Sequence, residues 1–310
     1  MLIKKTALLQ KVQCKHEWQY HAEKVAGVTT AHNCRTVYPP AKINIGLSVT
    51  GKRPDGFHNI ETVFYPVPLC DTLHVEKITG ADIAGKPDFR CDGFELPCNG
   101  ISENLCCKAY NLLNTDYDLP PAGIRLHKAI PVGAGLGGGS SDAAYTLLAL
   151  NDLFQLRIPD EELSQYASRL GSDCAFFLHG APAFGAGKGD VLEPIALSLA
   201  GYCIVLVKPP VFVSTADAYQ GVTPRDALYH LPEALQAPVS EWRNTVFNDF
   251  EESVFKRFPE ISRIKERLYC EGAVYAAMSG SGSCVYGIFE EKPDDVAKLF
   301  PGCFVWNDIF

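Results

Sequence analysis

The chain has 310 residues, of which 47% are apolar and 21% charged. This composition is typical of a globular protein with a large core and excludes a disordered chain. With 28 basic against 36 acidic residues, the net charge of −8 opposes a nucleic acid or an anionic membrane as the main partner. Twelve cysteines without a CxxC pair favour reduced thiols in the cytoplasm over a disulfide framework or zinc site.

Residues 1–34 differ from the rest of the chain. They hold five lysines against two glutamates, with weak apolar periodicity, and their apolar run at 7–9 is too short for a secretory signal. We therefore expect a poorly ordered extension at 1–34. A strand-like start at 202, after a segment of low charge, places a boundary between two domains at 35–200 and 201–310.

Predicted elements alternate along both domains. In the first domain, strands are predicted at 37–49, 61–68, 72–78 and 124–132. A helix is predicted at 105–113, capped by the polar residues 102–104. Apolar positions from 143 to 154 follow one helical face, and a second helix is expected from 160 to a glycine at 171. The second domain predicts strands at 202–207, near 274 and at 284–289, with helices at 248–267 and from 293. No apolar run approaches the roughly 20 residues of a membrane span.

The strongest local signal is a glycine-rich segment, 131–142, between a predicted strand and a predicted helix. Its five glycines let backbone amides approach an anion, and the positive end of the helix dipole favours that charge. An acidic protein can bind a nucleotide phosphate in this way without a lysine. The segment therefore predicts a phosphate-binding loop.

Three other interpretations of this segment compete with a phosphate-binding loop of this kind. Gly133, Gly135 and Gly138 match GxGxxG, but the acidic residue expected about 20 positions further on in a dinucleotide fold is absent. A P-loop needs a lysine after the glycines, and the sequence has Ser140 instead. A flexible turn without a ligand stays open, because serine and aspartate are also ordinary helix-capping residues.

The pattern Pro-x-Gly-x-Gly-Leu-Gly-Gly-Gly-Ser-Ser resembles the nucleotide loop of the GHMP kinases. Two further motifs of that superfamily, Pro-Ala-Lys-Ile-Asn at 40–44 and Met-Ser-Gly-Ser-Gly-Ser at 278–283, stand in the expected order. The resemblance implies an α/β (α+β) fold of two domains. An N-terminal mixed domain would carry the loop, a C-terminal ferredoxin-like domain would follow, and the active site would lie between them.

Within the superfamily, the chain resembles the 4-diphosphocytidyl-2-C-methyl-D-erythritol kinase family. The resemblance rests on Pro-Ala-Lys-Ile-Asn followed by Lys-Arg-Pro-Asp-Gly-Phe-His at 52–58, together with Gly-Ser-Asp at 171–173, and runs from about 37 to 289. It implies transfer of the γ-phosphoryl group of ATP to the 2-hydroxyl of that substrate in the non-mevalonate route to isoprenoid precursors. The alternatives are another GHMP small-molecule kinase, of mevalonate or homoserine type, and a non-catalytic sensor with this fold.

The resemblance assigns the reacting groups. Asp173 would accept the hydroxyl proton and orient the oxygen, a role that a carboxylate can fill in phosphoryl transfer. Lys42 would keep that carboxylate ionised and stabilise a developing alkoxide, and Asn44, on the same side of the strand, would contact the substrate hydroxyl. Without the resemblance, Asp173 can be interpreted as a helix N-cap and Lys42 as a solvent-facing strand lysine.

The resemblance also implies a cytosine site. Phe57 and His58 follow a Pro-Asp-Gly turn, and Tyr219 would offer the second face of an aromatic clamp around a flat pyrimidine, with Thr215 beside it. The family usually has tyrosine before the histidine, so Phe57 retains stacking and loses a hydroxyl. A lid on the core is the alternative interpretation of this aromatic pair.

The remaining implied contacts are to ATP. Asn104 would contact adenine and Lys128 a phosphate, although a helix cap and a surface lysine are equally ordinary interpretations. The ATP-binding residues are thus expected to be Asn104, Lys128, Pro131, Gly133, Gly135, Leu136, Gly137, Gly138, Gly139, Ser140 and Ser141. ATP chemistry implies Mg²⁺, whose protein ligands the sequence does not define. The partner is a small molecule, with no nucleic acid or membrane, and the protein is expected to be a monomer or weak homodimer.

Overall fold

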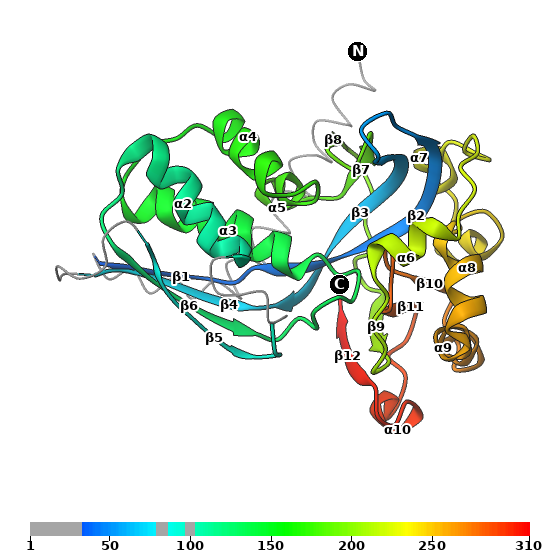
Figure 1. Cartoon of the computed structure of the whole chain (residues 1–310). Coiled ribbons are helices and arrows are strands. Elements are labelled where there is room, and N and C mark those ends of the chain that lie inside the picture. The colour runs from blue at the N-terminus through cyan, green and yellow to red at the C-terminus, as the bar shows by residue number, and fades with distance from the viewer. Residues whose placement is uncertain (1–32, 79–85, 97–102) are drawn as a thin grey trace, which may run out of the picture. The chain divides into compact units, whose positions relative to one another are not determined.

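The computed structural model describes residues 33–78, 86–96 and 103–310 (Figure 1). Its contacts divide the chain into two compact units that alternate along the sequence. Unit 1 takes the described residues of 1–41, 69–132 and 137–181, and unit 2 takes 42–68, 133–136 and 182–310. Segments of the first half of the chain therefore belong to unit 2, and the predicted domain boundary at 201 stays a prediction. The extension predicted at 1–34 lies almost wholly outside the described residues.

Unit 1 is a four-stranded sheet covered by helices. The strands lie in the order β1 (Cys34–Val37), β4 (Thr72–Lys77), β6 (Ala122–Lys128), β5 (Asp88–Gly93), and only the β5–β6 pair is parallel. The helices are α2 (Leu105–Tyr117), α3 (Gly138–Leu153), α4 (Asp160–Leu170) and α5 (Cys174–His179). Helix α3 packs on β4 and β1, with α2 alongside it (Figure 1).

Alternating burial explains why this sheet has one covered face. In β4, Leu73 and Val75 are fully buried, whereas their neighbours Thr72 and His74 are half-buried. Successive strand side chains point to opposite faces, so this alternation directs the apolar residues toward α3. On α3, Ala143, Leu147 and Leu150 are fully buried, as their helical spacing predicts.

Unit 2 contains two four-stranded sheets. One has the order β2 (Pro40–Lys52), β3 (His58–Cys70), β7 (Ala183–Ala186), β8 (Val191–Pro194), and β2 and β3 each have two residues at one end that belong to unit 1. The other sheet is antiparallel throughout, in the order β10 (Tyr275–Met278), β11 (Val285–Phe289), β9 (Cys203–Lys208), β12 (Phe304–Ile309). The helices are α6 (Thr215–Gln220), α7 (Leu231–Ala234), the 3-10 helix η2 (Val239–Asn244), α8 (Phe250–Arg257), α9 (Pro259–Cys270) and α10 (Val296–Leu299).

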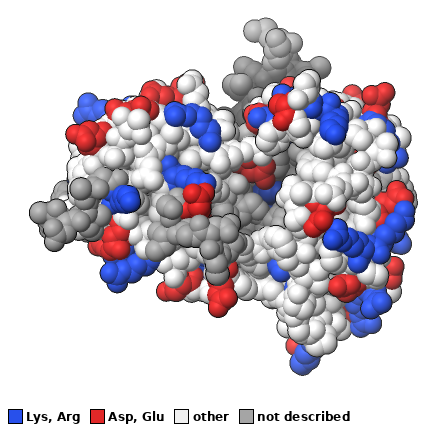
Figure 2. All heavy atoms as spheres, viewed as in Figure 1, with Lys and Arg blue, Asp and Glu red and all other residues white. Residues whose placement is uncertain are grey.

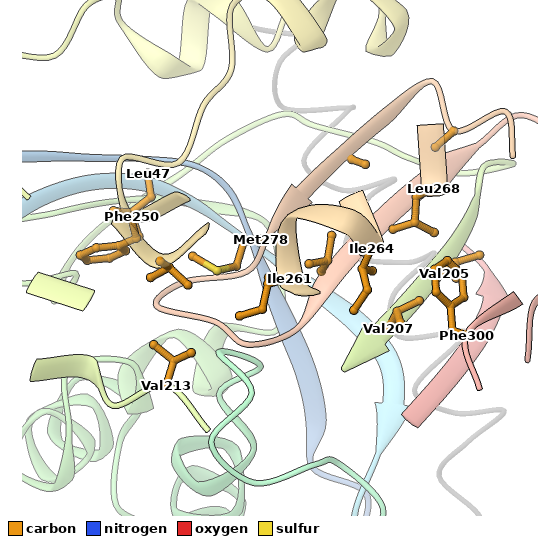
Figure 3. Packing of buried hydrophobic residues seen from close by; sticks show 14 of the residues in the cluster. Leu47, Val205, Val207, Val213, Phe250, Ile261, Ile264, Leu268, Met278 and Phe300 are labelled. Carbon is orange, nitrogen blue, oxygen red and sulfur yellow. The ribbon is translucent and has the colours of Figure 1, made fainter. Parts of the chain in front are cut away.

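The core of unit 2 joins the second sheet to its helices. Figure 3 shows Ile261, Ile264 and Leu268 of α9 turned toward the sheet residues Val205 and Val207. The i, i+3, i+7 spacing of these three helix residues produces one apolar stripe. At the other end of the cluster, Phe250 of α8 packs with Leu47 of β2 and Met278 of β10 (Figure 3).

Most predicted elements are confirmed within a few residues, including the helices α2, α3 and α4 and the strands β4, β6, β9 and β11. The single helix predicted at 248–267 is wrong, because the structure has α8 and α9 with a break at Phe258. Pro259 starts α9 at a position where its missing N–H costs nothing, and its ring keeps Phe258 out of the helical conformation, at φ −131° and ψ 75°. Strands β5, β7, β8 and β12 were not predicted.

The described surface carries charges of both signs. On the face that Figure 2 shows, the described Lys and Arg side chains are interspersed with Asp and Glu on each unit. Among the described helices, none combines the length and apolar character needed to cross a bilayer.

Candidate active site

The predicted phosphate loop leads directly into α3. Gly137 precedes the helix at φ +70° and ψ 12° and supplies no capping side chain, so the amides of the first turn stay available to an anion. Ser140 is half-buried, and its Oγ lies 3.9 Å from the position that a Cβ added at Gly171 would occupy. The Ser141 Oγ and Asp142 Oδ1 atoms are buried without a hydrogen-bond partner among the described residues.

Beneath this helix start lies a buried charge cluster formed by Lys128, Asp71 and Asp142. Lys128 Nζ contacts Asp71 Oδ2 and donates to Asp142 Oδ2 at 2.7 Å, and all three side chains are at most 4% exposed. Asp71 Oδ1 also accepts from the backbone N–H groups of Ala129 and Ile130, at 2.6 and 2.8 Å. The cluster therefore joins the end of β6 to the N-terminal part of α3.

The charges of this cluster shift two pKa values. Burial alone would lower the pKa of Lys128, but the two carboxylates outweigh it and raise that pKa. Burial also penalises the Asp142 carboxylate, and with the Asp71 charge it outweighs Lys128 and raises the pKa of Asp142 to about 7. Lys128, for which a surface lysine was one interpretation of the sequence, is thus buried at the centre of an ion-pair cluster.

In unit 2, strand β2 carries Lys42 and Asn44, which are 3% and 2% exposed. Lys42 Nζ donates to Asn44 Oδ1 at 2.5 Å and lies 5.4 Å from the centroid of the Phe64 ring. Asn44 Nδ2 donates to Thr62 Oγ1 at 3.0 Å. Neither residue is a solvent-facing strand side chain, because both are buried and hydrogen-bonded on the same side of β2.

The glycine-rich segment between β10 and β11 meets the phosphate loop inside unit 2. Ser279 Oγ donates to Gly135 O at 2.8 Å and accepts from Asn44 N at 3.2 Å. Gly135 has φ +75°, and a Cβ there would stand 2.0 Å from Ser279 O, so glycine is required for this approach. Leu136 O also accepts from Lys42 N at 2.9 Å. Three motifs far apart in the sequence are thereby joined.

The predicted cytosine-binding residues gather in unit 2. The rings of His58 and Tyr219 stack with centroids 4.5 Å apart and an interplanar angle of 14°. Phe57 is 59% exposed, with Lys188 Nζ 5.2 Å from its ring centroid. Thr215 Oγ1 lies 3.4 Å from Ser281 Oγ. A base cannot fit between His58 and Tyr219 at this spacing, whereas Phe57 offers an open face.

Asn104 and Asp173 both stand at the N-cap position of a helix, but they differ in whether the side chain makes the capping hydrogen bond. Asn104 Oδ1 caps α2 by accepting from Cys106 N at 2.8 Å. Asp173 occupies the N-cap position of α5 without the capping side-chain bond, and its Oδ1 accepts from Ser172 Oγ at 3.2 Å. The N-cap interpretation therefore describes Asn104 but does not explain the Asp173 side chain.

Sequence reasoning missed several residues that build these sites, among them Asp71, Thr62 and Lys188. The only sequence signal for Asp71 is an aspartate between two strands, which is also typical of a plain turn. The described residues contain no cluster of three or more side chains suited to a metal ion.

Comparison with known families defines the class of protein. The model of the GHMP kinases N terminal domain matches residues 104–181, which include the phosphate loop and Asp173. The model of the GHMP kinases C terminal domain matches residues 232–300, which include the segment at 278–283. The two matches fall on either side of the predicted boundary at 201.

Similarity to curated relatives identifies the family within this class. The 4-diphosphocytidyl-2-C-methyl-D-erythritol kinase of Bacteroides fragilis is 52% identical over 271 residues, which are 87% of this chain and 97% of that protein. The kinase of the same name from Cytophaga hutchinsonii is 47% identical over 258 residues, 83% of this chain and 93% of that protein. The chain therefore belongs to the 4-diphosphocytidyl-2-C-methyl-D-erythritol kinase family of the GHMP kinases.

Solved structures agree with this assignment. A crystal structure of a 4-(cytidine 5'-diphospho)-2C-methyl-D-erythritol kinase superimposes with a TM-score of 0.73 at 33% identity, over 88% of this chain and 98% of that one. The Methanococcus jannaschii mevalonate kinase has a TM-score of 0.65 at 14% identity, over 88% and 96% of the chains, and shares the fold. The predicted fold class and family are confirmed.

Proposed function

We propose that this chain transfers the γ-phosphoryl group of ATP to the 2-hydroxyl of 4-diphosphocytidyl-2-C-methyl-D-erythritol, within the non-mevalonate route to isoprenoid precursors. The observation that carries the proposal is the junction of strand β2, the phosphate loop and the segment after β10 through Asn44, Gly135 and Ser279. A family member at 52% identity bears the name of this activity. ATP is the phosphoryl donor, as in the kinase family.

The phosphates of ATP would bind to the backbone of the glycine loop. The amides that start α3 and the positive end of its dipole offset the phosphate charge. The loop residues proposed for this contact are Pro131, Gly133, Gly135, Leu136, Gly137, Gly138, Gly139, Ser140 and Ser141. Asn104 would contact adenine through its Nδ2, since its Oδ1 caps α2. Lys128 would act on the phosphate indirectly, because its ammonium is held by two carboxylates.

The acceptor would be activated by side chains of this chain. Asp173 would accept the hydroxyl proton and align the oxygen with the γ-phosphorus. Lys42 would stabilise the oxygen as it loses its proton, and Asn44 would hold the hydroxyl in place.

The cytosine would be recognised by Phe57, His58, Thr215 and Tyr219. The exposed ring of Phe57 is available for stacking, and Lys188 Nζ, 5.2 Å from the ring centroid, places a positive charge over it. Insertion of the base between His58 and Tyr219 would require their rings to separate. Phe57 lacks the hydroxyl that the family's usual tyrosine would supply, so polar recognition at this position would fall to its neighbours.

Mg²⁺ would accompany ATP. The orphaned Ser141 Oγ at the start of α3 is an oxygen ligand of the type that Mg²⁺ accepts, and no larger cluster of metal-ligating side chains is present among the described residues. The ion would thus be held mainly by phosphate oxygens and water, and it would neutralise charge on the transferred group. Cytoplasmic location and a monomeric or weakly dimeric state stay predictions from the sequence.

The test is ADP release from MgATP with the cytidyl substrate, beside mevalonate, homoserine and galactose. We expect turnover with the cytidyl substrate alone and a loss of about 10²- to 10⁴-fold in kcat for Asp173→Asn. Nucleotide affinity and thermal unfolding of the variant should match those of the wild type. Turnover with another acceptor would refute the proposed substrate, and nucleotide binding without any turnover would favour a sensor.

A further inference from the structure

The segment that joins β10 to β11 has little regular backbone pairing of its own. Met278 pairs with Val285, and the chain then turns through Gly280 and Gly282, at φ +54° and +86°. Ser279 N donates to Cys284 O at 2.9 Å, and Gly282 N donates to Ser279 O at 3.0 Å. The carbonyls of Met278 and Gly280 point away from this turn and need donors from elsewhere.

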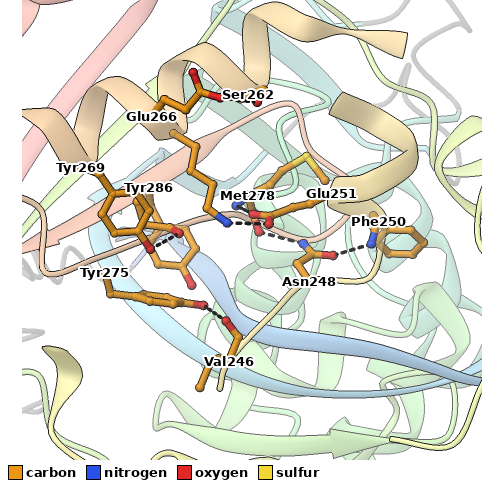
Figure 4. Close-up of polar contacts among 12 residues, drawn as sticks. Val246, Asn248, Phe250, Glu251, Ser262, Glu266, Tyr269, Tyr275, Met278 and Tyr286 are labelled. Carbon is orange, nitrogen blue, oxygen red and sulfur yellow. Dashed lines mark hydrogen bonds and ion pairs between the residues drawn. The ribbon is translucent and has the colours of Figure 1, made fainter. Parts of the chain in front are cut away.

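Asn248 supplies both donors. Its Nδ2 donates to Met278 O at 2.8 Å, and its Oδ1 accepts from Phe250 N at 3.0 Å (Figure 4). The same Nδ2 also donates to Gly280 O at 2.8 Å. The side chain is 4% exposed. A buried amide is costly unless its polar atoms are paired, and here three hydrogen bonds fix its position.

The backbone around Asn248 is tied to strand β2. Leu47 N donates to Phe247 O and Asp249 N donates to Leu47 O, both at 2.8 Å, which gives a parallel bridge between Leu47 and Asn248. Leu47 stands three residues after Asn44 on the same strand. Asn248 thus connects the strand that carries Lys42 and Asn44 to the segment that contacts the phosphate loop.

Glu251, one helical turn further on, supports the same segment from its other side. Its Oε1 accepts from Met278 N at 2.8 Å, and its Oε2 accepts from Lys265 Nζ at 2.6 Å (Figure 4). The N–H and the C=O of Met278 are therefore both held by side chains from the start of α8.

We propose that Asn248 is a positioning residue for phosphoryl transfer, which sets the segment 279–283 against the phosphate loop. The path runs from Nδ2 to Gly280 O, along the backbone to Ser279, and from Ser279 Oγ to Gly135 O. An apolar side chain of similar size would fill the core equally well, but it would leave two carbonyls without donors and the turn free to shift. The inference rests on the proposed function only in that ATP occupies this loop.

The decisive variant is Asn248→Asp, which keeps the size and the acceptor for Phe250 N but turns an oxygen toward two carbonyls. We expect the KM for ATP, and the Kd for the non-hydrolysable analogue AMP-PNP with Mg²⁺, to rise about 10- to 100-fold, since small displacements in a site cost this much. Hydrogen exchange of the amides at 279–284 should become faster. Asn248→Ser, which retains one short donor, should recover part of the nucleotide affinity.

Asp249→Asn is the matched control. Asp249 neighbours Asn248 and is bonded to Val49 N and Arg225, and its side chain makes no hydrogen bond to the described residues 279–283. This variant should lose thermal stability without faster exchange at 279–284 and without a rise in the Kd of AMP-PNP. Hydrogen exchange of the wild-type protein is a further test, and no folding defect can obscure it because no residue is substituted. AMP-PNP should slow the exchange of the amides at 279–284.

Two results would overturn the proposal. One is an Asn248→Asp variant that binds AMP-PNP as the wild type does, or weakens it only as much as Asp249→Asn. The other is wild-type protein in which AMP-PNP leaves exchange at 279–284 unchanged. Failure of the proposed substrate is distinguished by these binding measurements, because they involve no acceptor alcohol.

Discussion

The two units fix their own glycine-rich segments by different chemistry. Unit 1 fixes the start of α3 with Lys128 between two buried carboxyl groups, and these three groups carry one excess negative charge only when Asp142 is ionised. Unit 2 fixes the segment after β10 mainly with the neutral donors of Asn248 and Ser279. Both arrangements need their partners, but the strength of a buried ion pair also changes with protonation, whereas a hydrogen bond from a neutral amide or hydroxyl does not titrate. The first arrangement should therefore be sensitive to charge and pH, and the second to shape.

The largest effect is expected where a charge is removed from unit 1. Lys128→Met leaves Asp71 and Asp142 buried without their cation, so we expect a loss of about 3–5 kcal/mol in the free energy of unfolding. Urea denaturation measures this change. Lys256→Met, which breaks an exposed ion pair with Glu252, should leave the urea midpoint unchanged. A similar midpoint for both variants would show that the cluster contributes little to stability.

A shape change in unit 2 should come next. In Gly135→Ala, the new Cβ would collide with Ser279 O, and the positive φ adds strain, so we expect a loss of about 1–3 kcal/mol and weaker ATP binding. Thermal unfolding and the Kd of AMP-PNP report the two effects. Gly139→Ala is the stability control, because a Cβ added at Gly139 would lie 3.8 Å from Leu105 Cδ1, which is an ordinary contact distance. Equal destabilisation by both substitutions would contradict the close approach.

The pH dependence of stability separates the two units. The pKa of Asp142 rises from 3.8 to about 7 on folding, so between these values the native state binds more protons than the unfolded state. Stability from this group is therefore present at low pH and declines as pH rises toward 7, by at most about 1.4 kcal/mol per pH unit. Denaturation from pH 4 to 8 should show a flatter profile of stability against pH for Asp142→Asn than for the wild type. The Asn248 side chain in unit 2 does not titrate, so it contributes no such pH dependence. An unchanged profile in Asp142→Asn would refute the shift.

The smallest effect is expected from a single neutral hydroxyl. Ser279→Ala removes the bond to Gly135 O and the acceptor of Asn44 N, with an expected loss of about 1 kcal/mol and a severalfold higher KM for ATP. Ser262→Ala is the control, since its hydroxyl bonds only the exposed Glu266 side chain among the contacts drawn in Figure 4. If both variants match the wild type in KM for ATP, the Ser279 contact does not position the loop.

Local chemistry explains which elements could be predicted. The helix at 160–170 has acidic residues in its first turn and a glycine after its end, and α3 follows a glycine loop with regular apolar spacing. The break at Phe258 was missed because apolar spacing continues across it, although Pro259 carried the signal. Short strands such as β7 and β8 have four residues each and too few alternations to be recognised.

The sequence by itself determined the class of protein, because three motifs in a fixed order, with glycines and helix starts suited to phosphate, do not depend on the rest of the fold. Tertiary structure alone decided that Lys128 is buried between Asp71 and Asp142, that Ser279 meets Gly135, and that Asn248 holds Gly280. These partners lie 14 to 144 residues apart. Burial and pairing over such separations follow from packing, which no local pattern of residues encodes.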